Sequence, residues 1–267
     1  MKIRWWLLLP LLSALLFTAC GAGQGTREEF LFAMGNSDVP VGEYTSRILS
    51  YYGIDESAAA DHITYGSNVK EVVSAIVEGT ADCGVIYETD AAAAGLTPVA
   101  RAEEAQCGKV VYPAAVLKAA KNPAAKHFLE YLTGEEAASV FEVIGFTPME
   151  RREFAPSAGD TGEITVFAAS SLTESLTELG RRYEALVPGV TLVFQFDSSG
   201  TLKTQIEEGA DCDLFLSASQ KHMDALAELV DPTSRVDLLE NKVVLCVAES
   251  SPVSVDSFDR LAELLQR

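Results

Sequence analysis

The chain has 267 residues, 48% of them hydrophobic and 22% charged, a composition typical of a globular protein with one or two domains. Its formal net charge is −19 at pH 7. A surface this acidic argues against binding to nucleic acid and against charge-driven docking on anionic lipid. It also means that any bound anion must be held by local dipoles and hydroxyl groups, against the overall field of the protein.

The first twenty residues have the pattern of an export signal. Lys2 and Arg4 form a basic start, and residues 5–17 form an apolar core that is too short for a comfortable membrane span. Small residues precede Cys20, which resembles a bacterial lipoprotein signal with cleavage before Cys20 and lipid on its thiol. A plain secretory signal with an incidental cysteine is the alternative. Residues 21–27 would follow as a short flexible tether.

Four more cysteines follow the signal, and an exported protein permits disulfides between them. Cys83 and Cys107 are one conceivable pair, whereas Cys246 lies inside an apolar run and is expected in the core. The cysteine spacing matches no zinc pattern. Because the three histidines are scattered, we expect no histidine metal site.

The first part of the mature chain alternates short apolar runs with helical patterns. Predicted strands cover residues 31–35, 63–66 and 83–87, and predicted helices cover 43–52 and a segment that Ser67 or Asn68 caps. Pro40 and Gly42 shape the loop before the first helix. Strands that alternate with helices predict a mainly parallel α/β sheet, in which ligands lie at the C-terminal ends of the strands.

The middle of the chain contains a predicted crossing strand and a linker. The extended run over 109–117 includes Pro113, which favours an edge or crossing strand over a central one. Helical patterns follow at 124–132 and 135–144. Residues 149–161 are rich in charge, proline, serine and glycine, and this composition indicates a linker.

Two serine pairs in the second half stand where a predicted strand meets a predicted helix. One pair, with Ser171, follows a strand over 164–169, and the other, with Ser199, follows a strand over 190–196. A serine at such a junction caps the helix, so its hydroxyl and the first free N–H groups face one point that suits an anion. Together the pairs suggest a pocket for a small oxyanion, with simple helix capping as the alternative for each.

The last part of the chain continues the α/β pattern. Predicted elements are a strand at 213–217, a helix at 221–229, a second long extended run at 241–248 and a final helix at 257–265. We expect the run at 241–248 to be the partner of the run at 109–117.

Several of these segments resemble the molybdate-binding proteins of bacterial ABC importers. Residues 164–172, 198–202 and 213–219 resemble the N-terminal half of that family. Residues 35–42, 68–69, 84–90, 112–116, 141 and 145–146 resemble its C-terminal half. The two halves stand in the opposite order, so we interpret the chain as a circular permutant whose old termini are joined by 149–161. A damaged or fused gene is the alternative, and the distance between about Arg27 and Arg267 in the folded protein separates the two.

The resemblance implies a two-lobed periplasmic-binding-protein fold, with mainly parallel sheets and two crossing hinge strands. One lobe would comprise residues 28–111 and 248–267, and the other residues 112–247. Ligand would lie in the cleft between them, and the lobes would close by a hinge motion.

The resemblance also implies a ligand and its site. Molybdate is a tetrahedral dianion that offers only hydrogen-bond acceptors, so its site needs donors. The implied donors of a molybdate or tungstate site are Ser171 (or its neighbour Ser170), Ser199, the backbone N–H groups of Val41 and Val69, and the phenol of Tyr87. Molybdenum would enter only as the oxyanion, and no cofactor is expected.

The implied function is that of a monomeric extracytoplasmic binding protein. It would be anchored by lipid to the outer leaflet of the cytoplasmic membrane and would deliver its oxyanion to an ABC permease. A protein for sulfate, phosphate or an iron chelate, or a rearranged remnant without transport function, is the alternative. A serine hydrolase is disfavoured because no histidine stands in a recognisable motif and no Gly-x-Ser-x-Gly elbow is present. We therefore expect no enzymatic activity and no nucleic-acid partner.

Overall fold

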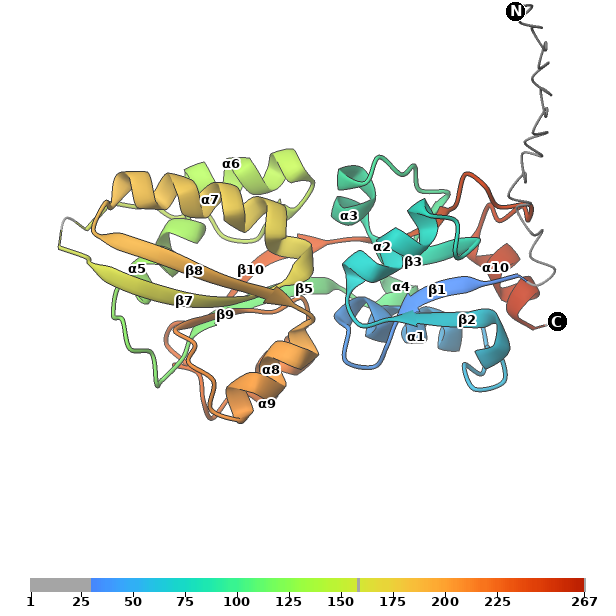
Figure 1. Cartoon of the computed structure of the whole chain (residues 1–267), viewed down its shortest axis with the longest axis horizontal. Coiled ribbons are helices and arrows are strands. Elements are labelled where there is room, and N and C mark those ends of the chain that lie inside the picture. The colour runs from blue at the N-terminus through green and yellow to red at the C-terminus, as the bar shows by residue number, and fades with distance from the viewer. Residues whose placement is uncertain (1–29, 158, 267) are drawn as a thin grey trace, which may run out of the picture.

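The chain forms two α/β lobes that lie side by side along its long axis (Figure 1). The structure is a computed structural model that describes residues 30–157 and 159–266. We call the lobe on the five-stranded sheet lobe A and the lobe on the six-stranded sheet lobe B. The two-lobed α/β fold predicted from the sequence is confirmed. The predicted export signal, Cys20 and the tether lie outside the described residues.

Lobe A is built on a mixed sheet with the strand order β2-β1-β3-β11-β4. The first three strands are parallel, and the last two add antiparallel pairs. Helices cover both faces, so the short apolar runs of β1 and β3 are buried without alternation. The strands are β1 (Phe32–Gly35), β2 (Ile63–Gly66), β3 (Cys83–Tyr87), β4 (Ala100–Arg101) and β11 (Val243–Val247).

The helices of lobe A begin at residues that suit a first turn. Pro40 opens the first helix, where its missing N–H costs no hydrogen bond. Asn68 caps the next helix by accepting a hydrogen bond from the Glu71 N–H at 3.1 Å. The helices are α1 (Pro40–Tyr51), α2 (Val69–Val77), α3 (Glu88–Ala93), α4 (Glu104–Cys107) and α10 (Phe258–Leu265), with a 3-10 turn at Ala60–His62.

Lobe B is built on a mixed sheet with the order β6-β10-β5-β9-β7-β8. Helices α5, α6 and α7 cover one face, and α8 and α9 cover the other (Figure 1). The strands are β5 (Val110–Val116), β6 (Thr147–Pro148), β7 (Gly162–Ala169), β8 (Val190–Asp197), β9 (Leu214–Leu216) and β10 (Val236–Asn241). The helices are α5 (Ala125–Leu132), α6 (Glu135–Ile144), α7 (Thr173–Leu186), α8 (Ser199–Glu207) and α9 (Gln220–Ala225), with a 3-10 turn at Ser170–Leu172.

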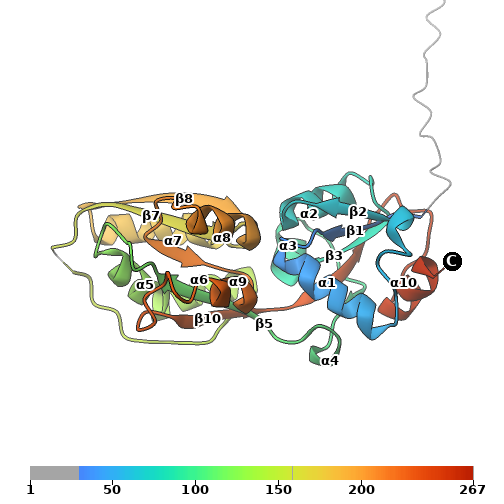
Figure 2. The same cartoon turned by 90° about the horizontal axis from the view of Figure 1, so that it is seen from below.

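The chain crosses between the lobes from α4 to β5 and again from β10 to β11, as Figure 2 shows from below. The expected partnership between 241–248 and 109–117 is wrong, because β5 pairs with β10 and β11 pairs with β3 and β4. The chain changes sheets at Lys242, so the predicted run over 241–248 consists of the last residue of β10 and the whole of β11. The lobe boundaries expected near 111 and 248 remain a prediction; they fall in β5 and directly after β11.

The described ends of the chain lie together in lobe A. His62 Nδ1 is 3.2 Å from the Phe30 carbonyl oxygen. The same His62 lines a hollow of about 490 Å³ together with Leu265 and Gln266. Residues 27 and 267, whose separation would test the permutation, lie outside the described ranges. Phe154, in the segment predicted to be a linker (149–161), packs against lobe B, with its ring centroid 5.2 Å from that of Tyr131.

The described cysteines are buried free thiols, so the conceivable Cys83–Cys107 disulfide is not formed. Cys246 is fully buried in β11, which confirms its predicted place in the core. Across residues 30–157 and 159–266, no group of three or more His, Cys, Asp or Glu side chains is arranged to hold a metal ion.

A buried carboxylate ties the framework of lobe B together. Asp213, directly before β9, accepts hydrogen bonds from the backbone N–H groups of Lys121, Asn122 and Thr165. These donors come from the loop after β5 and from β7, so one side chain joins three segments that are distant in sequence.

We expect Asp213→Ala to lower the free energy of unfolding by about 3 kcal/mol, because it leaves buried N–H groups unpaired. Asp211→Ala is the control. Its carboxylate pairs with Lys121, but both side chains are 70% exposed, so the expected change is under about 0.5 kcal/mol. Urea unfolding of the two variants measures the difference, and equal effects would contradict the role of Asp213.

Candidate functional site

A small cavity lies where the two lobes meet. It is lined by Val69 and Tyr87 from lobe A and by Ser171 and Ser199 from lobe B, four of the five sequence-predicted ligand residues. The fifth, Val41, stands next to the lining residue Pro40 in the first turn of α1. The cavity volume is about 10 Å³, which is about the space of one water molecule. The structure thus brings the predicted residues together, and their ligand-binding role remains a prediction.

Larger hollows lie elsewhere in the molecule. One of about 510 Å³ lies in lobe B, lined among others by Lys118, Lys121 and Asp211, and it includes none of the predicted ligand residues. Its lining mixes basic and acidic side chains that already have partners, such as Lys121 with Asp211. The chemistry of an anion site therefore favours the small cavity over the large one.

The serine pairs of lobe B act differently from each other. Ser198 caps α8 by accepting a hydrogen bond from the Thr201 N–H at 3.1 Å, so simple capping is confirmed for this residue. Ser199 does not cap; its Oγ accepts from the Ala218 N–H at 2.9 Å. Ser171 lies in the 3-10 turn before α7, where no side chain caps, and its Oγ is 3.0 Å from the Tyr112 hydroxyl. The expected capping by the first pair is therefore wrong, because the tight turn replaces a cap.

Lobe A turns the starts of two helices toward the cavity. Val41 and Val69 lie in the first turns of α1 and α2, where a helix has no acceptor for its own N–H groups. The predicted loop at Pro40 and Gly42 is the first turn of α1, and it packs closely, since a Cβ on Gly42 would lie 2.3 Å from the carbonyl oxygens of Gly35 and Asn36. Both helix starts thus offer backbone N–H groups that the helix itself does not pair.

Tyr87 presents a buried hydroxyl to the cavity from the C-terminal end of β3. The residue is 1% exposed, and its hydroxyl has no hydrogen-bond partner among the described residues. Its ring meets those of Tyr44 and Tyr112 edge to face, with centroids 6.4 and 5.7 Å away. Burial raises the pKa of the Tyr87 phenol well above its usual value, so the group remains a neutral donor. A buried unpaired hydroxyl costs about 1–3 kcal/mol, which a ligand acceptor would relieve.

The lining of the cavity is neutral apart from one carboxylate. No Lys, Arg or His belongs to the described lining residues. Asp197 is the acidic one; it is partly exposed, and its Oδ1 accepts from the Ser198 N–H at 2.6 Å. An anion would therefore be held by hydroxyl and N–H groups, as the acidic composition required.

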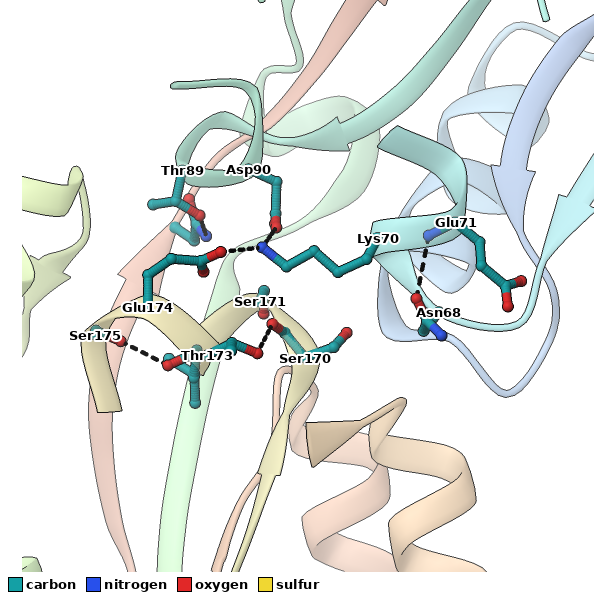
Figure 3. Close-up of polar contacts among 12 residues, drawn as sticks. Asn68, Lys70, Glu71, Thr89, Asp90, Ser170, Ser171, Thr173, Glu174 and Ser175 are labelled. Atoms are coloured by element: carbon teal, nitrogen blue, oxygen red, sulfur yellow. Dashed lines mark hydrogen bonds and ion pairs between the residues drawn. The ribbon is translucent and has the colours of Figure 1, made fainter. Parts of the chain in front are cut away.

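An ion pair spans the two lobes beside the cavity. Figure 3 shows the Lys70 side chain reaching from α2 toward Asp90 and Glu174. Its Nζ is 3.0 Å from Asp90 Oδ1 in lobe A and 2.8 Å from Glu174 Oε1 on α7 of lobe B. This trio was not predicted from the sequence, since nothing in the local patterns marks a lysine whose partners are distant in the chain.

Other contacts between the lobes surround the cavity. The Gly200 N–H donates to the Asp38 carbonyl at 3.0 Å, and the Ser219 hydroxyl donates to the Glu43 carboxylate at 3.3 Å. With the Lys70–Glu174 pair, these contacts hold the lobes together over more than one edge of the cavity. The chain thus adopts a closed arrangement around the donors.

The chain is similar to a family model described as bacterial extracellular solute-binding protein, which matches residues 22–147 and 164–266. It is 37% identical over 131 residues to the molybdate-binding protein ModA of Haemophilus influenzae, covering 48% of each chain. It is 43% identical over 94 residues to the molybdate-binding protein ModA of Escherichia coli K12, covering 34% of this chain and 36% of that one. The chain thus spans about half the length of the first of these relatives, and less of the second.

A second group of similarities concerns a lipoprotein and a solved structure. The chain is 36% identical over 118 residues to the putative ABC transporter substrate-binding lipoprotein YvgL of Bacillus subtilis, covering 43% of this chain and 45% of that one. A phosphate-binding protein of a Streptococcus pneumoniae ABC transporter superposes with a TM-score of 0.55 at 14% identity, covering 89% of this chain and 95% of that one. This last likeness concerns the fold alone.

The buried carboxyl of Asp90 should make the free energy of unfolding depend on pH. Burial raises its pKa from 3.8 to about 6, although Lys70 opposes the shift. An acid with a raised folded-state pKa stabilises the fold below its unfolded pKa and loses that contribution as the pH rises through the folded value. Relative to Asp90→Asn, the native protein should therefore lose up to about 3 kcal/mol of unfolding free energy between about pH 4 and pH 7. Chemical unfolding of both proteins across this range measures the loss, and a constant difference would contradict it.

Proposed function

The chain belongs to the family of bacterial extracellular solute-binding proteins, and from this premise we propose that it captures molybdate or tungstate between its lobes. In this proposal it delivers the oxyanion to an ABC permease. The observation that carries it is the unpaired buried hydroxyl of Tyr87, in the cavity shared with Ser171 and Ser199. The molybdate-binding relatives support the choice of ligand.

The donors suit a tetrahedral dianion because they are numerous, neutral and come from both lobes. Val41, Val69 and Tyr87 approach from lobe A, and Ser171 and Ser199 from lobe B. An anion that accepts hydrogen bonds from both sides favours the closed arrangement, since it gains all five donors only there. In this proposal ligand capture and hinge closure are one event, and Lys70 with Glu174 assists at the edge.

We further propose that the protein is a monomer anchored outside the cytoplasm through lipid on Cys20. The residues before Cys20 and the similarity to a relative named a lipoprotein support this. Within the described part of the chain, no helix has the length and hydrophobicity to cross a membrane.

The reversed order of the two halves is proposed to be a circular permutation. Three observations support it. The family model matches almost the whole mature chain, but in two segments separated by residues 148–163. The pairwise similarities each reach about half a chain or less, as a collinear alignment of permuted sequences would. The ends near Phe30 and Gln266 approach a common residue, His62.

Placing the two halves in the opposite order should preserve the fold and the binding of ligand. A chain in which residues 162–267 precede residues 28–148 through a short Gly-Ser linker is expected to fold and bind with similar affinity, because the described ends at Phe30 and Gln266 lie near the same residue, His62. The control opens the chain after Val166 inside β7, which pairs with β8 and β9, and should fail to fold. Circular dichroism and calorimetric titration compare the chains; misfolding of the first rearrangement would contradict the permutation.

Calorimetric titration with molybdate, tungstate, sulfate and phosphate tests the proposed ligand. We expect strong binding of molybdate and tungstate, and Tyr87→Phe should weaken it by about 10- to 100-fold, corresponding to about 1–3 kcal/mol. The same change should raise the melting temperature without ligand, because it removes a buried unpaired hydroxyl.

Tyr183→Phe is the matched control, since its hydroxyl is also buried and unpaired among the described residues but lies away from the cavity. It should stabilise the protein and leave binding unchanged. A folded protein that takes up none of the four anions would refute the proposed function and favour a rearranged remnant. Tight binding of sulfate or phosphate alone would make this a binding protein for another oxyanion.

A further inference from the structure

A polar hollow lies in lobe B, outside the cleft. Its volume is about 100 Å³, which is room for several water-sized groups and so for a phosphate group. None of the five sequence-predicted ligand residues lines it. Helix α5 forms one wall, the loop that leads into β10 forms another, and Arg152 from the segment over 149–161 adds a third. The hollow therefore joins three segments that are distant in the sequence.

Positive charge is concentrated in this hollow. Lys126, Arg152 and Arg235 line it together with a single carboxylate, that of Glu130. The whole chain has the opposite balance, with 20 basic and 39 acidic residues. Because like charges repel each other at close range, three cations that share one small hollow favour an anion between them.

The three cations keep hydrogen-bond donors for such an anion. Within the described residues, the Lys126 ammonium forms no ion pair and no hydrogen bond. Arg235 pairs with Asp224 at 2.6 Å, and Arg152 pairs with Glu150, in each case through one terminal nitrogen. A guanidinium has several further N–H donors, and both acidic partners lie outside the hollow. Most of the donors therefore remain available to a ligand.

The helix that carries Lys126 does not explain its position. Lys126 lies in the first turn of α5, where the helix dipole disfavours a positive charge. Glu130 follows one turn later on the same face, but no ion pair joins the two side chains in the described part of the chain. A ligand in the hollow would supply the negative charge that the helix does not.

Backbone contacts hold Arg152 at the hollow. Its N–H donates to the Thr133 carbonyl oxygen at 2.8 Å, directly after α5, and the residue forms a parallel bridge with Gly134. Two residues further on, the Phe154 ring packs against Tyr131 of the same helix. Arg152 is thus part of the wall of the hollow, although it belongs to the segment predicted to be a linker.

We propose that this hollow is a binding site for a phosphate group, separate from the cleft. The planar guanidinium groups of Arg152 and Arg235 suit pairs of phosphate oxygens, and the Lys126 ammonium adds a point charge. The acidic composition of the chain disfavours an anionic membrane as the source of this group, so we expect a soluble phosphate compound. Bound there, the compound would tie the segment over 149–161 to α5 and stabilise the fold.

Calorimetric titration of the native protein with pyrophosphate at pH 7 tests the site. Pyrophosphate is too large for the cavity of about 10 Å³ in the cleft, so saturable binding reports on the hollow. Lys126→Gln, Arg152→Gln and Arg235→Gln should each weaken this binding by about tenfold, the effect of one hydrogen bond between charged groups.

Glu130 is the strongest rival to a ligand, because its carboxylate already lies in the lining. If this carboxylate neutralised the three cations, native protein would bind no pyrophosphate and only Glu130→Gln would bind it, which would overturn the proposal. We expect instead that native protein binds pyrophosphate and that Glu130→Gln binds it more tightly, since a like charge is removed.

Two control variants should leave the affinity for pyrophosphate unchanged. Arg181→Gln removes the same charge from α7, where the side chain is 69% exposed, pairs with Glu178 and does not line the hollow. Ser171→Ala alters the cleft alone. An equal loss in Arg181→Gln would reveal attraction by overall charge, and a loss in Ser171→Ala would place the anion in the cleft. Either result would overturn the site.

Vesicles distinguish a soluble compound from a lipid headgroup. We expect the native protein to sediment no more with phosphatidylglycerol vesicles than with phosphatidylcholine vesicles. Sedimentation with the former that Arg152→Gln abolishes would support the site and overturn the soluble source. A native protein that binds neither pyrophosphate nor these vesicles would overturn the proposal. Binding of molybdate in the cleft is measured separately, because the hollow and the cavity share no lining residue.

Discussion

The hydroxyl of Tyr87 is the constraint on which the geometry of the cavity depends. The hydroxyl is buried, the rings of Tyr44 and Tyr112 pack edge to face against the Tyr87 ring, and the hydroxyl has no hydrogen-bond partner among the described residues. In a closed arrangement this unpaired donor costs free energy that an acceptor placed in the cavity would recover. The same reasoning extends to the helix starts at Val41 and Val69, so closure without an acceptor is disfavoured at several points at once.

Contacts at the edge of the cleft stabilise the closed arrangement only weakly by comparison. Weak contacts of this kind allow the lobes to open. Lys70 pairs with Glu174, whose side chain is 48% exposed, and such exposed pairs contribute little after solvent screening. The buried partner of Lys70, Asp90, belongs to the same lobe and therefore does not hold the lobes together. A closed state with costly unpaired donors inside and modest contacts outside is one that a ligand can shift.

Much of the fold was predictable because its signals are local. Apolar runs marked β1, β3 and β7, and Asn68 marked the start of α2, whereas α1 begins at Pro40, three residues before the predicted start at 43. The errors concern pairings between distant segments. Residues 241–248 looked like a single strand opposite 109–117, but only contacts between β10 and β5 reveal that the chain changes sheets at Lys242. The two serine pairs looked equivalent, yet Ser198 caps its helix whereas a 3-10 turn replaces the cap at Ser171.

The sequence by itself determined which residues are donors, because a strand end followed by a helix start exposes hydroxyl and N–H groups wherever it occurs. Only the tertiary structure decided that donors from α1, α2, β3, α8 and the turn before α7 meet at one cavity. It also placed Ser171 Oγ 3.0 Å from the Tyr112 hydroxyl, to which the Asn241 amide donates at 3.2 Å, although these three residues are distant in the sequence. Such contacts arise from three-dimensional neighbours, and no local pattern encodes them.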